Sequence, residues 1–257
     1  MYPVVELFGK TIPTYWLCTL TGIAICSVVA FIRHKEFKEL QQVDITNLAA
    51  LIFIGALIGS RLLFIVTISP AIVKNFDLLI HNKTLAYELL SNGMVFYGGM
   101  IGALYILYWY SRKYRLNVKM VTDYFVPLFP LFHTFGRVGC FLTGCCHGFV
   151  SEKYGIAFTD SISSANGIPY FPIQLVSSAL NLVFFVLLII FERKHHKEGY
   201  TVYAYLATYA IGRFIIEFFR GDTVRGFFLG VSTSQWISII ILAVLAYKLV
   251  RYYRKKA

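Results

Sequence analysis

Charged residues are scarce in this chain of 257 residues, since only 14% are Asp, Glu, Lys or Arg against 58% hydrophobic residues. Soluble domains carry about 25% charged residues, so an ordinary soluble fold is excluded. Acidic residues are the scarcer kind, with 13 against 24 Lys and Arg and a net charge of +11. The basic residues fall in short clusters between apolar runs, which is typical of membrane topology. We therefore expect a membrane and no nucleic acid as partner.

Cysteines are also few. The five cysteines are too few and too badly placed for a disulfide scaffold. Cys18 and Cys26 lie in the first apolar run, where thiols usually act as small hydrophobes. The other three, Cys140, Cys145 and Cys146, cluster near the end of the fourth run.

Apolar runs dominate the chain, and their lengths suit a hydrocarbon core of about 30 Å. The seven expected spans are residues 11–32, 47–68, 94–110, 121–142, 170–191, 200–219 and 231–250. Pro127 and Pro130 predict a kink in the fourth. The first run is too long for a signal-peptide core and lacks a basic leader, so we expect it to remain as a helix. The fold class expected is an all-α integral membrane protein, with one polytopic domain over residues 1–257.

Basic residues also predict the orientation. Fifteen Lys and Arg lie in 33–46, 111–120, 192–199 and 248–257, and six lie in the N-terminal segment, 69–93, 143–169 and 220–230. The richer set should be cytoplasmic, which places the N-terminus outside and the C-terminus inside. The long connections 69–93 and 143–169 are then outer loops. Long loops in a compact fold are usually functional, so we expect the site to face outward.

Three arginines remain, and each lies inside a span. Arg61, Arg137 and Arg213 stand 14, 16 and 13 residues along their spans, roughly 20 Å from the inner boundary. An arginine at mid-bilayer costs roughly 2.5–3.5 kcal/mol, so three of them need a reason. Guanidinium groups bind phosphate through paired donors and keep their charge. We expect these three side chains to meet in one pocket in the outer half of the membrane.

A single acidic residue clearly shares that depth. Glu217 follows Arg213 by one helical turn and can pair with it, on a face that also carries Tyr209 and Arg220. These residues could pair merely to hold the helices together. One glutamate cannot neutralise three arginines, however, so an anionic ligand is favoured. Glycines beside the arginines, Gly98, Gly99 and Gly139 among them, would let a headgroup approach closely.

Six segments together resemble the prolipoprotein diacylglyceryl transferase family over nearly the whole chain. They read IGSRLLFIV (58–66), GMVFYGGMIG (93–102), GRVGCFLTG (136–144), FPIQL (171–175), YAIGRFIIEFFR (209–220) and VSTSQWISI (231–239). The resemblance implies transfer of a diacylglyceryl group from phosphatidylglycerol to the lipobox cysteine of a prolipoprotein. Glycerol phosphate would leave at the outer face of the bacterial plasma membrane, with no metal or soluble cofactor required.

The resemblance also implies roles for individual residues. Arg137 and Arg213 would hold the phosphate or the leaving group, and Glu217 would orient Arg213. Tyr209 would form a hydrogen bond with the headgroup. Cations placed there would stabilise charge that develops as the thiolate attacks. The remaining substrate-binding positions would be Arg61, Gly98, Gly99, Gly139, Thr143, Gly144, Gly148, Gln174 and Arg220.

The chain departs from the family at reactive positions. Tyr97 replaces the family's histidine and is a much poorer base at neutral pH. Cys140 and Thr143 replace two asparagines, and Cys145 replaces an acidic residue. Phe171, Val176 and Ser177 replace the His and Tyr-Glu of the fifth-span motif.

The clustered cysteines leave several hypotheses open. The cluster could form a Cys140–Cys145 disulfide, bind zinc with His147 or His133, supply a nucleophilic cysteine, or only pack. His147 is the better candidate to replace the missing base, whereas His133 on its apolar run suits a hydrogen-bonded bundle residue. We therefore count Tyr97, Cys140 and His147 with Arg137, Arg213 and Glu217 as candidate catalytic residues.

Two other functions remain as alternatives. A paralogue of the same fold could pass another phospholipid-derived group to a different acceptor, which the changes at Tyr97 and Cys140 favour. The chain could also be an anion transporter, but it shows neither inverted repeats nor a matched pair of broken spans.

Overall fold

The computed structural model describes residues 2–7, 9–37, 39–82, 84, 93, 95–162, 166–194, 198–221 and 227–254. The chain divides into two compact units. The first contains Met1–Arg33 and Thr122–Ala257, and the second contains His34–Val121.

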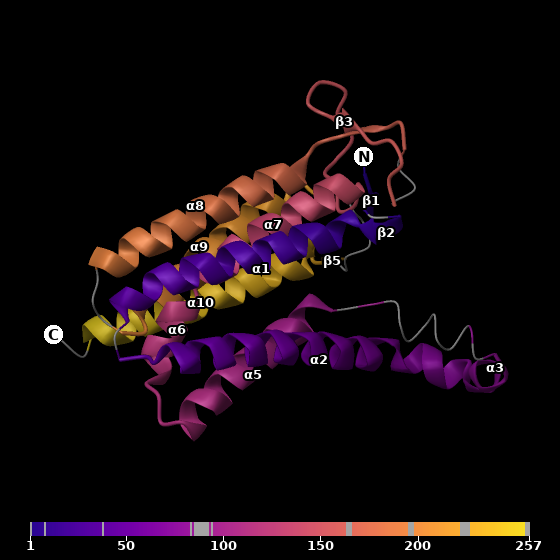
Figure 1. Ribbon diagram of the computed structural model, residues 1–257. Coiled ribbons are helices and arrows are strands. Elements are labelled where there is room, and N and C mark those ends of the chain that lie inside the picture. Colours follow the sequence, from indigo (N-terminus) through magenta and orange to yellow (C-terminus); the bar gives the residue numbers. More distant parts are fainter. Residues whose placement is uncertain are drawn as a thin grey trace. The chain divides into compact units, whose positions relative to one another are not determined.

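The first unit is a helical bundle with short strands near the helix ends (Figure 1). Its helices are α1 (Thr14–Arg33), α7 (Leu128–Thr143), α8 (Ile173–Lys194), α9 (Tyr200–Glu217) and α10 (Thr233–Arg254). Helix α7 packs between α1 and α8, while α9 packs between α8 and α10. Three antiparallel ladders join β1 (Val4–Leu7) to β2 (Lys10–Pro13), β3 (Ile156–Ala157) to β4 (Pro169–Tyr170), and β5 (Phe227–Phe228) to β6 (Val231–Ser232).

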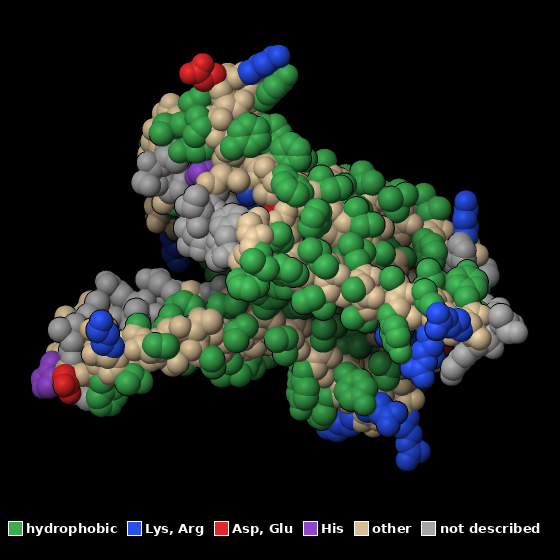
Figure 2. Space-filling view, turned by 180° about the vertical axis from the view of Figure 1, so that it is seen from behind, with side chains coloured by type: hydrophobic (Ala, Val, Ile, Leu, Met, Phe, Trp, Pro, Cys, Tyr) green, Lys and Arg blue, Asp and Glu red, His purple; other side chains and the backbone are tan. Residues whose placement is uncertain are grey.

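Helix α8 shows how these helices distribute polarity. Its buried face carries the polar residues Gln174, Ser177, Ser178 and Asn181, whereas apolar residues such as Val183 are about half exposed. A helix at a water surface shows the opposite arrangement. Figure 2 likewise shows hydrophobic side chains over much of the face drawn. The last turns of α1, α8 and α10 carry Lys or Arg. Apolar surface of this extent fits contact with lipid.

Hydrogen bonds join α7 to α8 inside the bundle. Ser178 Oγ donates to the carbonyl of Thr134 at 3.1 Å, and Thr134 Oγ1 donates to the carbonyl of Ser178 at 3.4 Å. At another end of the bundle, Arg33 of α1 forms an ion pair of 2.6 Å with Glu192 of α8. Apolar side chains contact lipid as favourably as they contact each other, so they give little preference for one helix packing. Polar contacts between helices therefore fix the helix positions.

The second unit consists mainly of a packed helix pair. It contains η1 (His34–Glu36), α2 (Gln42–Lys74), α3 (Phe76–His81) and α5 (Phe96–Lys113). Helices α2 and α5 approach closely because glycines face each other. A Cβ added at Gly59 would overlap the carbonyl of Gly98, and one at Gly102 would overlap the carbonyl of Gly55. Small residues at such positions let membrane helices pack closely.

Each predicted span contains a described helix, and the structure is mostly helical. Among the described residues, five segments are long and apolar enough to cross a membrane: Thr14–Glu36, Gln42–Lys74, Val118–Thr143, Ile173–Lys194 and Thr233–Arg254. Helices α5 and α9 are not among these five, because tyrosines and charged residues lower their hydropathy. The described chain is therefore an all-α protein of the multi-pass membrane type.

Two details of the spans concern proline. The predicted interruption at Pro127 is confirmed, since α6 (Val118–Phe125) ends before it and α7 begins after it. Pro130 is accepted in the first turn of α7, where backbone N–H groups have no partner within the helix. Helix α2, in contrast, continues through Pro70 to Lys74. Part of the predicted loop 69–93 is thus helical, and residues 83, 85–92 and 94 lie outside the described part.

Candidate functional site

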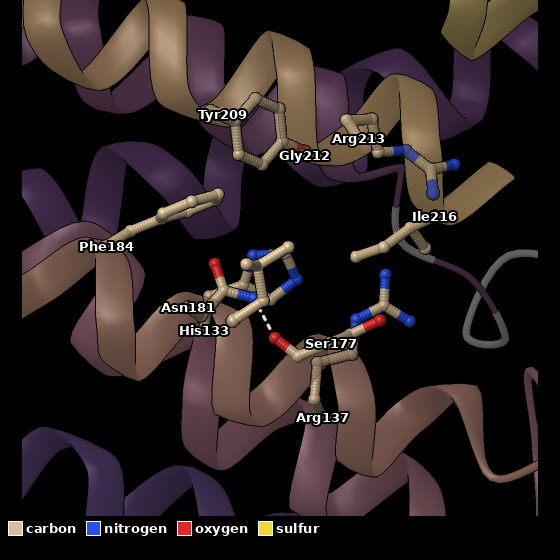
Figure 3. Close-up of a pocket in the computed structure, with 10 residues that line it drawn as sticks. His133, Arg137, Ser177, Asn181, Phe184, Tyr209, Gly212, Arg213 and Ile216 are labelled. Carbon is tan, nitrogen blue, oxygen red and sulfur yellow. Dashed lines mark hydrogen bonds between the residues drawn. The ribbon is translucent and has the colours of Figure 1, made fainter.

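A pocket lies among α7, α8 and α9 of the first unit (Figure 3). The residues that line it are His133, Arg137, Ser177, Leu180, Asn181, Phe184, Tyr209, Gly212, Arg213 and Ile216. Arg137 and Arg213 thus reach one pocket from two helices, and Figure 3 shows both guanidinium groups toward the same end, beside Ile216. Two of the three predicted arginines share a site.

Arg213 is held by two neighbours. Its Nη2 forms an ion pair of 2.7 Å with Oε2 of Glu217, one turn on in α9, as predicted. The same nitrogen donates a hydrogen bond of 2.9 Å to Ser234 Oγ of α10. Both charged side chains are nearly buried, with 12% and 6% exposure. These contacts fix the guanidinium in the pocket before any ligand arrives.

Arg137 is held less firmly. Its side chain is half-buried, and its Nε is fully buried without a hydrogen-bond partner among the described residues. Burying a charged donor without a partner is costly. The pocket lining contains two guanidinium groups, whereas the carboxylate of Glu217 pairs with only one of them. This arrangement is suited to an anion that accepts hydrogen bonds from Arg137.

Helices α7, α8 and α9 add further polar groups to the pocket. His133 precedes Arg137 by one turn, and Tyr209 precedes Arg213 by one turn, so each lies on the same helix face as its arginine. Asn181 donates to the carbonyl of Ser177 at 2.7 Å, which is the dashed line in Figure 3. Sequence reasoning missed Asn181 and favoured a bundle role for His133. The spacing of four residues between His133 and Arg137 was a usable signal.

Arg61 belongs to the second unit. It lies in α2, and its Nη1 donates to the carbonyl of Gly93 at 2.8 Å. Tyr97, Gly98 and Gly99 lie in the first turn of α5 in that unit; Gly98 is buried against α2 and Tyr97 is 40% exposed. The predicted meeting of Arg61 with the other arginines stays a prediction.

The end of α7 is a tight, well-bonded turn. Gly144 has a left-handed backbone (φ 73°), and its N–H bonds the carbonyl of Phe141 at 3.1 Å. Thr143 Oγ1 donates to the carbonyl of Gly139 at 2.9 Å, and Ser161 Oγ donates to the carbonyl of Gly144 at 2.7 Å. A Cβ at Gly139 would press on Tyr15 and Cys18 of α1. Gly139, Thr143 and Gly144 therefore each have a structural role in this turn.

The segment after α7 is anchored by backbone contacts. Gln174 is fully buried and donates to the carbonyl of Cys145 at 2.7 Å. Gly148 forms an isolated bridge with Arg220, which lies beyond the end of α9. The prediction that Arg220 shares a helical face with Arg213 is therefore wrong, because α9 ends at Glu217. Phe158, with 0% exposure, stacks on Tyr170 and fixes the loop.

His147 lies in this segment and does not line the pocket. Its Nδ1 lies 3.0 Å from the carbonyl oxygen of Gly148, and its ring packs on Tyr170 with centroids 3.8 Å apart. Its role as a base stays a prediction.

The three clustered cysteines are brought together by this fold. Cys140, Cys145 and Cys146 are half-buried free thiols, and their sulfurs all lie within 4.8 Å of one another. Hydrogen bonds with the thiols of Cys140 and Cys145, followed by the charges of Arg220 and Arg137, lower the pKa of Cys146 below its ordinary value. The Cys140–Cys145 disulfide and the nucleophilic cysteine both stay hypotheses.

Comparison with known proteins identifies the family. The family model described as "Prolipoprotein diacylglyceryl transferase" matches residues 3–251. The chain belongs to the prolipoprotein diacylglyceryl transferase family. A phosphatidylglycerol–prolipoprotein diacylglyceryl transferase of Clostridium tetani is 34% identical over 256 residues, which cover 98% of this chain and 99% of the relative. A second such enzyme from Clostridium perfringens is 34% identical over 239 residues, 92% of this chain and 90% of the relative. One from Idiomarina loihiensis is 32% identical over 236 residues, 90% of this chain and 85% of the relative.

Membership in the prolipoprotein diacylglyceryl transferase family makes the chain one of a family of membrane transferases and confirms the resemblance. Tyr97, which the resemblance sets where the family has a histidine, lies at the start of α5, and Arg137 and Arg213 line the pocket. That Tyr97 takes the place of the family's base stays a prediction.

Proposed function

We propose that this chain transfers the diacylglyceryl group of phosphatidylglycerol to the lipobox cysteine thiol of a prolipoprotein and releases glycerol phosphate. The names of the relatives support the substrates, since several are phosphatidylglycerol–prolipoprotein diacylglyceryl transferases. The observation that carries the proposal is the pocket with two guanidinium groups and one paired carboxylate.

In this proposal the donor phosphate lies against Arg137 and Arg213. The acceptor sulfur attacks the glycerol carbon that carries the phosphate, and the C–O bond breaks with its electron pair leaving on glycerol phosphate. The leaving group gains negative charge in that step. Guanidinium groups that are already positioned lower the barrier because they need not reorganise as the charge develops.

The neighbouring residues have supporting roles. Glu217 and Ser234 hold Arg213, so that its guanidinium group lines the pocket where the phosphate would bind. Tyr209 and His133 line the same pocket and are placed to bond the headgroup. Arg61, Gly98 and Gly99 of the second unit stay candidate substrate-binding residues, as the family motifs imply.

We further propose seven spans, with α5 and α9 crossing the membrane beside the five apolar segments. The N-terminus is outside, the C-terminus is cytoplasmic, and the site opens to the outer face of a bacterial plasma membrane as part of one polytopic domain. The distribution of basic residues supports this orientation. Epitope tags at either end test it. In intact spheroplasts, protease should remove the N-terminal tag and spare the C-terminal one, and the reverse would refute the orientation.

Purified protein in detergent tests the reaction itself. With phosphatidylglycerol and a lipobox peptide, we expect release of glycerol phosphate and a gain of one diacylglyceryl mass on the peptide. A peptide with Ser in place of the lipobox Cys, and phosphatidylcholine as donor, serve as controls. Absence of both products would refute the proposal. Glycerol phosphate released without modified peptide would instead favour a paralogue with another acceptor, which the changes at Tyr97 and Cys140 motivate.

A further inference from the structure

The cysteine cluster begins with the way α7 ends. Cys145 N–H bonds the carbonyl of Cys140 at 3.0 Å, while Gly144 adopts a left-handed backbone between them. This is the Schellman motif, which brings the side chain after the glycine back against the last full turn of the helix. The turn therefore sets the Cys145 thiol beside that of Cys140.

Cys146 completes the cluster through an unusual backbone. Its φ is +58°, a left-handed conformation that residues other than glycine rarely adopt because the Cβ is crowded. Strain of this kind is typical of positions that function requires. Here it accompanies three sulfurs that lie within 4.8 Å of one another.

The spacing of the sulfurs fits a metal ion. Three thiolates on tetrahedral zinc, with Zn–S distances of about 2.3 Å, lie about 3.8 Å apart, so small side-chain rotations are sufficient. In the described part of the chain, no fourth His, Cys, Asp or Glu belongs to this group. Three protein ligands with an open fourth position are typical of catalytic zinc sites, whereas structural sites have four.

Surrounding groups hold the ligands in place. Thr143 Oγ1 lies 3.5 Å from the sulfur of Cys145, and buried Gln174 binds the carbonyl of the same residue. Such outer contacts orient metal ligands. A zinc ion with three thiolates has a net charge of −1, and the guanidinium groups of Arg220 and Arg137 act on this cluster with opposite charge. Arg137 lies three residues before Cys140, about 4.5 Å along the helix axis, so cluster and phosphate pocket are neighbours.

We propose that Cys140, Cys145 and Cys146 bind one zinc ion as thiolates and that its open fourth position takes the thiol of the acceptor peptide. This inference rests on the proposed transfer reaction and departs from the expectation that no metal is needed. The acceptor thiol displaces water from the zinc and gives its proton to solvent, because a coordinated thiol is deprotonated. Its sulfur then forms the C–S bond as the C–O bond to phosphate breaks. The metal thereby supplies the deprotonation that Tyr97 cannot.

Metal content provides a test that does not depend on activity. Full-length protein is purified under reducing conditions, and its zinc is measured by mass spectrometry. We expect one zinc per chain, and less than a tenth of that in Cys145→Ser and in Cys140→Ser. Cys26→Ser is the matched control, because this thiol lies in α1 and bonds the carbonyl of Leu128 outside the cluster. Size-exclusion chromatography and circular dichroism verify folding of each variant.

Cobalt in place of zinc reports the acceptor directly. Thiolate-to-cobalt absorption should appear in the wild type and in Cys26→Ser. It should rise by about one third on addition of a lipobox peptide, because four thiolates replace three. The peptide with Ser in place of Cys should leave the absorption unchanged.

Four results would overturn the zinc proposal: no bound zinc, an unchanged cobalt spectrum in Cys145→Ser, no response to the lipobox peptide, or full transferase activity in metal-free protein. A disulfide among these cysteines in protein purified without reductant, with no zinc bound after reduction, would assign the cluster to redox chemistry instead. Activity without zinc would leave the transfer reaction standing. A cobalt response to the peptide without any lipid transfer would refute the transfer reaction alone.

Discussion

Replacing Arg137 with Lys separates the charge of this side chain from its shape. Lysine keeps the positive charge but has a single ammonium in place of the planar fork, so it cannot make two parallel bonds to a phosphate. Nε of Arg137 is buried without a hydrogen-bond partner among the described residues. The side chain also forms no ion pair with a carboxylate in that part of the chain, so no such carboxylate would hold a lysine at this position.

The size of the effect follows from the bonds lost. A hydrogen bond to a charged group contributes about 1.5–3 kcal/mol. Losing one in the transition state lowers kcat/KM by about 10- to 100-fold, since roughly 1.4 kcal/mol corresponds to a factor of ten. The assay is release of glycerol phosphate from phosphatidylglycerol as a function of donor concentration, with the lipobox peptide saturating.

Arg251→Lys is the matched control, because Arg251 is exposed near the end of α10. It should retain wild-type kcat/KM. If Arg137→Lys also kept full activity while inserting normally in the membrane, paired binding of the phosphate by Arg137 would be refuted.

Further variants test other parts of the structure. Glu217→Gln removes the ion pair of 2.7 Å that positions Arg213, and kcat/KM should fall by about tenfold or more for a lost charged bond; wild-type kinetics would contradict this role. Gly59→Ala would make the new Cβ overlap the backbone of α5. This overpacking should lower the stability of the detergent-solubilised protein by about 1–3 kcal/mol, measured by thermal unfolding. Gly136→Ala, whose Cβ would meet nothing nearer than 3.9 Å, should be neutral or stabilising, and equal losses in both variants would disprove the packing argument. Gly144→Ala should lower the stability of the protein, because Gly144 has a positive φ and an added Cβ would overlap Ser161. Adding Ser161→Gly should restore only the stability lost to that overlap. Complete restoration would show that the positive φ costs nothing and would refute this explanation.

The sequence predicted the elements that depend on composition. Apolar runs located the helices to within several residues at most ends, and Pro127 marked the break between α6 and α7. The glycines at which α2 and α5 approach each other, such as Gly59 and Gly98, were identified only by the structure. Helix α2 exceeded its prediction because a single proline, Pro70, does not end a helix whose other residues favour it.

The sequence could predict less of the pocket. Depth along the spans placed Arg137 and Arg213 at similar levels, and both line one pocket. Helix α8 is apolar over most of its length, so periodicity alone does not show that Ser177 and Asn181 face the bundle. The gathering of three thiols also depends on the positive φ of Cys146, which no spacing rule reveals.

The most direct measurement of the central claim is an experimental structure of the protein with phosphatidylglycerol bound. The account predicts the lipid phosphate within hydrogen-bonding distance of the guanidinium groups of both Arg137 and Arg213, with Glu217 still paired to Arg213. A phosphate bound elsewhere, with these two arginines turned away from it, would contradict the account.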